Sequence, residues 1–269
     1  MKWNRTRAQY RRRDAALPTL AGMSTPPAAA TSTAPARGPA GGHPLLRAPI
    51  VPTILRLSGP ALVLVVFQIA VSVADTYFIG RLGTQALAGF SLVFPMVQLL
   101  QMLSGGAMGG GVSSAVARSL GAGDDAAARS VVIHALVIAV SAGLAYTLLM
   151  ALAGEAIFRV LGGRGEALSL ALDYAGLLFA GAVFVWFTNT FGALLRGTGN
   201  TLMPALVQVT AHLVHIPLSG ALVLGWGGLP SQGIRGAAIA YVVASATSSL
   251  LGAVAVLRPG SRLRPRRAD

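Results

Sequence analysis

The stretch that decides the fold is "FQIAVSVADTYFIGRLG", residues Phe67 to Gly83. It continues an apolar run: residues 57–74 carry no charge, Asp75 is a lone acid, and the next charge is Arg81. An apolar run of this length predicts a helix that spans a membrane. A carboxylate in such a helix is costly in lipid, so we expect Asp75 to face a bundle interior or a watery cavity.

The composition of the whole chain supports a membrane protein. Of 269 residues, 54% are hydrophobic and 11% are charged, whereas about 25% of a soluble domain is charged. The net charge of +13 could suit nucleic acid, but no basic face with interleaved aromatic residues is present, so no nucleic-acid partner is expected. The lack of cysteine excludes disulfides, thiolate metal sites and cysteine nucleophiles.

Charged residues divide the chain into apolar stretches. The six helices expected from these stretches are residues 51–80, 85–119, 125–153, 166–195, 200–225 and 234–257. The sequence "GAGDD" would end the second helix, with Asp124 or Asp125 as the N-cap of the third. The run "SGGAMGGGVSS" is a place where the second helix could break or kink. We predict an all-α fold, a polytopic membrane bundle of six transmembrane helices.

The flanks of this bundle differ from it in composition. Residues 1–48 begin with "RTRAQYRRR" and continue rich in Ala, Pro, Thr and Gly, which predicts a disordered tail before a transmembrane lobe at 49–257. Residues 258–269 form a basic C-terminal tail. Six spans put both termini on one side, and that side would hold 17 of the 21 basic residues. The positive-inside rule therefore predicts cytoplasmic termini, in a multi-pass protein of the bacterial inner membrane.

Two of the predicted helices carry polar stripes. In the first, Gln68, Ser72 and Asp75 share a face, which favours a cation or proton site, although Asp75 could also be a hydrated residue near the interface. The fifth helix has a longer stripe, formed by Gln208, His212, His215 and Ser219. A histidine there could move a proton, or the stripe could be polar packing between helices. Two histidines without a third ligand do not predict a metal site.

Other polar residues are weaker candidates. Gln98 follows a proline in the second helix and Asn189 lies late in the fourth, and each could line a cavity or serve packing. No Ser/His/Asp constellation is apparent, and the glycine run at 105–111 lacks the "GK[ST]" ending of a nucleotide loop. We therefore expect no enzyme activity and no cofactor.

Several stretches resemble the multidrug and toxic compound extrusion (MATE) transporters. "VADTYFIGRLGTQALAGFSLVFP" (73–95) is similar to the end of that family's first helix and the start of its second. "ARSLGAGDDAAAR" (117–129) resembles its turn between helices 2 and 3. "GALLRGTGNTLMPALVQV", followed by "GWGGLPSQGIRGAAIAYVVA", resembles its turn between helices 4 and 5 and its entry to helix 6. The similarity runs from about residue 50 to 257 in the family's order.

The resemblance implies an efflux antiporter that exchanges a small molecule, expected to be an organic cation, for H⁺ or Na⁺. In that family an acid at the position of Asp75 takes part in cation coupling. Many members have an Asn and, four residues later, an Asp on helix 5, where this chain has His215 and Ser219. A sodium site prefers several oxygen ligands, so the missing carboxylate favours a proton shared by Asp75 and a histidine of helix 5.

The resemblance also implies a larger assembly, since the family has twelve spans in two lobes and this chain shows six. The chain could be a truncated product, a half-transporter that pairs with a second six-helix lobe or as a homodimer within membrane lipid, or a non-transporting module. A lipid-precursor flippase of related architecture is a further alternative. That reading needs a strongly basic central cavity, whereas the arginines fall at span ends.

Overall fold

The structure, a computed structural model, describes residues 50–228 and 230–264. The chain divides into two units, Met1–Ala48 and Pro49–Asp269, and every described residue belongs to the second. The expected disordered tail at 1–48 lies outside the described residues, as does the end of the basic C-terminal tail at 265–269.

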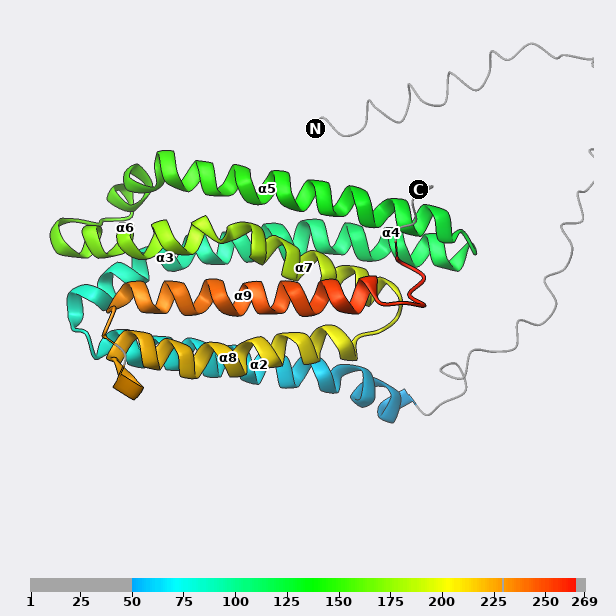
Figure 1. Ribbon diagram of the computed structural model, residues 1–269, viewed down its shortest axis with the longest axis horizontal. Coiled ribbons are helices and arrows are strands. Elements are labelled where there is room, and N and C mark those ends of the chain that lie inside the picture. The colour runs from blue at the N-terminus through cyan, green and yellow to red at the C-terminus, as the bar shows by residue number, and fades with distance from the viewer. Residues whose placement is uncertain (1–49, 229, 265–269) are drawn as a thin grey trace, which may run out of the picture. The chain divides into compact units, whose positions relative to one another are not determined.

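The described part is helical throughout, with short turns and no strand, so the all-α prediction is confirmed (Figure 1). Its elements are α2 (Ile50–Gly80), α3 (Thr84–Gln101), the π-helix η2 (Met102–Met108), α4 (Gly109–Gly121), α5 (Asp125–Val160), α6 (Gly165–Ala180), α7 (Ala182–Gly197), α8 (Leu202–Leu224), the 3₁₀ turn η3 (Trp226–Gly228) and α9 (Ile234–Leu257). The predicted N-cap is Asp124, whose Oδ1 accepts the Ala127 N–H at 2.8 Å. α5 runs past the expected end at 153 to Val160, and Glu155 and Arg159 pair across its last turns at 2.5 Å.

The described helices supply up to six candidate membrane crossings. In the described residues, five stretches are long and apolar enough to span a membrane alone, and the sixth crossing is the pair α6 and α7, which are bent by 48° at Gly181. A single straight helix was expected there. The bend occurs where Gly181 meets α9: a Cβ on Gly181 would lie only 2.6 Å from Val242 Cγ2.

The second crossing also departs from a regular helix, at the glycine-rich run that the sequence marks as a weak point. Residues Met102–Met108 form one π-helical segment between α3 and α4. A π-helix widens the turn and shifts the side chains that follow it, and such segments are frequent at functional sites.

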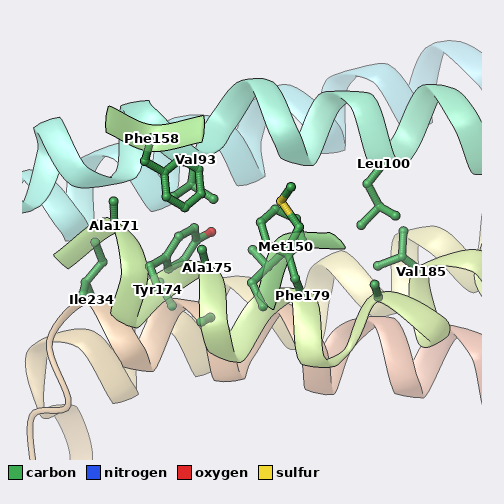
Figure 2. Packing of buried hydrophobic residues seen from close by; sticks show 14 of the residues in the cluster. Val93, Leu100, Met150, Phe158, Ala171, Tyr174, Ala175, Phe179, Val185 and Ile234 are labelled. Atoms are coloured by element: carbon green, nitrogen blue, oxygen red, sulfur yellow. The ribbon is translucent and has the colours of Figure 1, made fainter. Parts of the chain in front are cut away.

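The bundle has two ends (Figure 1). The Gly197 end holds the start of α2, the α4–α5 and α7–α8 turns and the end of α9, and the Gly80 end holds the other turns. α2 packs on α8, α8 on α9, and α9 on α6 and α7, while α3 packs on α6 and α5 on α7. Figure 2 shows the apolar side chains between these helices, including Phe158, Tyr174 and Phe179.

Small residues let several backbones approach closely. A Cβ on Gly143 of α5 would lie 2.8 Å from Val183 Cα of α7, and one on Gly236 of α9 would lie 2.6 Å from the carbonyl carbon of Leu222 in α8. Close approach through small residues is typical of helix packing in membranes.

The first residues of the basic C-terminal tail turn back onto the bundle. Leu263 is 1% exposed and joins an apolar cluster with Val116 and Val132. Arg262 Nε and Nη2 donate to Asp125 Oδ1 at 3.0 and 2.6 Å. Residues 258–264 therefore pack on the α4–α5 turn instead of extending away from it.

Candidate functional site

Asp75 lies in the interface between α2 and α8, near the Gly80 end. Only 7% of the residue is exposed, which excludes the alternative of a hydrated residue at the interface. His215 Nε2 lies 3.0 Å from Oδ1 and 2.9 Å from Oδ2, and Ser219 Oγ donates to Oδ1 at 2.8 Å. The structure thus brings together the three residues that the sequence proposes for cation or proton coupling.

The geometry of α8 explains how two of its residues reach one carboxylate. His215 and Ser219 are four residues apart, so both face α2, and both are buried, at 2% and 0% exposed. Pro217 lies between them inside the helix. Proline has no N–H to complete the helical hydrogen bond, so α8 is weakened locally beside the buried pair.

A polar network continues from this site across the bundle. The ring of Tyr241 in α9 meets the His215 ring edge to face, with centroids 6.1 Å apart. Gln101 Nε2 donates to the Tyr241 hydroxyl at 2.9 Å. Asn189 Nδ2 donates to Gln101 Oε1 at 2.9 Å and to Ser104 Oγ at 2.7 Å. The network therefore links α8, α9, α3, α7 and the π-helical segment.

A small cavity of about 60 Å³ lies beside this network. Its lining includes four of the candidates from the two polar stripes, Gln68, Gln208, His212 and His215, together with Gln101 and Tyr241. His212 Nε2 is buried and has no hydrogen-bond partner in the described residues. The cavity is polar and just large enough for ordered water, which could satisfy this nitrogen.

Two candidates lie apart from the site. Ser72 is exposed and lines none of the described cavities, because three residues along a helix place it about 60° from Asp75, at the edge of the buried face. Gln98 is exposed on α3, and the glutamine one turn later, Gln101, enters the network in its place.

The sequence did not predict that the last helix, α9, contributes side chains to the polar network and the cavity. Tyr241 and Ser248 of α9 reach the network and the cavity, yet α9 has an almost uniformly small and apolar sequence with no stripe to mark them. Tyr241 does fall within the stretch that resembles the MATE entry to helix 6, which was the available signal.

The chemistry of the site is that of a buried histidine–carboxylate pair. The described residues contain no group of three or more His, Cys, Asp and Glu residues placed to bind a metal. Both oxygens of Asp75 face the His215 nitrogen, and one also accepts from Ser219. A histidine and a carboxylate in contact can take up and release a proton by changing the charge of the pair between minus one and zero.

Comparison with known proteins identifies the family of this chain. The sequence profile of the MatE family matches residues 60–220, more than half of the chain. The chain belongs to the MatE family. It is a multi-pass membrane protein of a transporter family, and not an enzyme.

Relatives of this MatE chain include a FAD transporter of Shewanella oneidensis, 33% identical over 198 residues, and a probable multidrug resistance protein, NorM, of Thermotoga maritima, 32% identical over 193. The matches cover 74% and 71% of this chain but 44% and 41% of the relatives. The chain thus spans less than half the length of these relatives.

Solved structures give a similar result. A MOP superfamily transporter from Pyrococcus furiosus superposes with a TM-score of 0.74 at 32% identity, covering 84% of this chain and 49% of that one. A multidrug resistance MATE family transporter in an inward-facing conformation gives 0.68 at 31% identity, covering 74% and 46%. The described bundle therefore has the architecture of about half of a MATE transporter.

Proposed function

We propose that this chain is a proton-coupled lobe of a small-molecule efflux antiporter, and that Asp75 and His215 carry the coupled proton. The observation that supports the proposal is the buried contact of His215 Nε2 with both oxygens of Asp75. When the pair takes up a proton it becomes neutral overall, which lowers the cost of its burial. Such a change of charge can bias a lobe between two conformations.

Sodium is the less favoured coupling ion. The position that carries a second acid in many MATE transporters is Ser219 here, and the hydroxyl already donates to Asp75. A hard cation such as sodium prefers several oxygen ligands, and Asp75 and Ser219 supply one carboxylate and one hydroxyl, whereas a proton needs only the two groups in contact. No cofactor is needed in this proposal.

Transport in this proposal requires a second six-helix lobe, because alternating access generally moves one repeat against another around a central site. That lobe could belong to a longer form of the protein, to another chain or to a second copy of this one. We place the Gly197 end in the cytoplasm of a bacterial inner membrane, since the positive-inside rule favours it.

Two cargo classes are consistent with the relatives. Organic cations are the class that the MATE resemblance implies. FAD is the second candidate, because the Shewanella oneidensis relative at 33% identity is a FAD transporter.

The test is proton release from acidified inverted membrane vesicles when ethidium, a cationic dye, or FAD is added. The intact chain is expected to release protons with one of them, and Asp75→Asn and His215→Gln are expected to abolish the release. The matched controls are Asp173→Asn and His134→Gln, which alter an exposed acid and an exposed histidine. Proton release that survives Asp75→Asn would overturn the proton role.

Two further measurements separate the alternatives. A sodium gradient replacing the pH gradient should drive no exchange, and if it does, sodium is the coupling ion. An intact chain that responds to neither gradient, in vesicles where cross-linking detects no second lobe or dimer, would favour the non-transporting module.

A further inference from the structure

A larger cavity, of about 290 Å³, lies between α7, α8 and α9 toward the Gly197 end of the bundle. Its walls are partly apolar, with Leu64, Leu195 and Val207 among them. Its polar lining consists of Thr188, Asn189, Thr201, Gln208, Ser248 and Arg196. Among the described residues of this lining, Arg196 is the one that carries a charge, and it gives this part of the cavity a positive character.

Arg196 is exposed, and its guanidinium lies along the surfaces of α7 and α4 at the edge of the cavity. A Cβ on Gly192, one turn earlier in α7, would lie 3.1 Å from Nη1, and one on Gly109, at the start of α4, would lie 3.8 Å from Nη2. The group thus rests over two glycines, which leave room for it.

No carboxylate neutralises Arg196 among the described residues. The two acids near this end have other roles: Asp124 caps α5 and Asp125 pairs with Arg262. The described ion pairs are those of Glu155 with Arg159, Asp125 with Arg262 and Asp75 with His215. The guanidinium donors of Arg196 can therefore bind an anionic ligand that enters the cavity.

Other groups around the cavity add to its preference for an anion. Gln208 Oε1 accepts from Ser248 Oγ at 3.3 Å, so the glutamine presents its amide N–H groups as the remaining donors. The first turn of α8 lines the cavity through Thr201, Pro204 and Ala205. The positive end of the helix dipole therefore faces the same space and supports the charge of Arg196.

We infer that this cavity binds the phosphate group of an organic phosphate, with Arg196 as the principal anchor and the apolar wall holding the organic part. Arginine presents a planar fork that pairs with phosphate through two parallel hydrogen bonds. If the phosphate belongs to a transported molecule, the inference rests on the proposed efflux function. The same chemistry is offered by a phospholipid headgroup, and the test distinguishes these two sources.

The test measures equilibrium binding of radiolabelled adenosine monophosphate and of adenosine to the full chain in dodecyl maltoside micelles, which contain no phosphate, with no pH gradient. The two probes differ only in the phosphate. The monophosphate is expected to bind roughly tenfold or more tightly than adenosine, the effect of one charge-assisted contact. Arg196→Gln is expected to remove the difference, and Arg196→Lys to restore part of it.

Arg118→Gln is the matched control, because Arg118 is an exposed arginine at the same end, in the last turn of α4, and does not line the cavity. A thermal unfolding midpoint close to that of the intact chain shows that each variant is folded. Equal binding of the two probes, or a phosphate preference that survives Arg196→Gln, would overturn the inference.

Adding phosphatidylglycerol to the phosphate-free micelles identifies the source of the phosphate. If it displaces the monophosphate in the intact chain, and its ³¹P signal broadens only when Arg196 is present, the site takes a lipid headgroup. If the monophosphate stays bound, the site takes the phosphate of a soluble cargo. Because Asp75→Asn should bind the monophosphate normally, loss of proton-driven efflux and loss of this site give different results.

Discussion

His215 Nε2 lies within 3.0 Å of both carboxylate oxygens of Asp75, although the two residues are 140 positions apart in the sequence and belong to different helices. Both are almost completely buried, so each is the principal electrostatic partner of the other. The contact joins α2 to α8 and stabilises their packing as well as serving the proposed proton chemistry.

His215→Ala is expected to destabilise the bundle by on the order of 3 kcal/mol, because it leaves a buried carboxylate without its partner. Asp75→Asn removes the charge, so adding His215→Ala to it should cost much less than the single change. Unfolding of the four proteins of this double-mutant cycle in detergent measures the difference. Additive effects would mean that the two residues do not interact energetically.

Ser219→Asp places a second carboxylate against Asp75, where Ser219 Oγ now lies 2.8 Å from Oδ1. Two carboxylates at this separation repel unless a cation or a proton lies between them. We expect the variant to unfold at a higher temperature in sodium chloride than in potassium chloride, since bound sodium would stabilise the folded state. The intact chain should show no such difference, and a variant indifferent to sodium would contradict the proposed reason for proton preference.

Gln101→Leu removes the hydrogen bond to Tyr241 and the one from Asn189. Each lost bond costs about 1 kcal/mol, so the unfolding midpoint should fall. Proton release in the vesicle assay should fall with it, because Tyr241 no longer has a fixed position against His215. Gln98→Leu, one turn earlier and exposed, is the control. Equal effects of the two changes would show that the network has no special role.

Gly181→Ala should destabilise the bundle by roughly 1–3 kcal/mol, the usual range for overpacking, because the new methyl group would lie 2.6 Å from Val242. Gly176→Ala adds the same methyl group in α6 where nothing lies within 4 Å. It should leave stability unchanged or raise it by up to about 1 kcal/mol. Thermal unfolding compares them, and a neutral Gly181→Ala would mean that α9 can move away at no cost.

The sequence predicted the position of several helix ends because charges and turn residues delimit membrane spans strongly. The ends of α2 and α9 agree with the expected ranges, and Asp124 caps α5 as expected. The break at Gly181 could not be predicted from one glycine in an apolar run, because it depends on the approach of Val242 from a distant helix.

The candidate site was predictable to the extent that it followed helical periodicity. Spacings of three and four residues placed His215 and Ser219 on one face, and the structure turns that face toward Asp75. Tyr241 and Arg196 were not predicted as site residues, since neither lies in a polar stripe. Their positions depend on how α7 and α9 pack, which a single sequence does not contain.

The glycine contacts described for the fold have a mechanical consequence. Gly143 against Val183, Gly181 against Val242 and Gly236 against Leu222 tie α5, α7, α9 and α8 together in series at nearly backbone distance. Closely packed interiors have low compressibility and transmit displacement without absorbing it. Those four helices should therefore behave as one rigid body. In any conformational change of the lobe they should move together, with little change in their packing against one another.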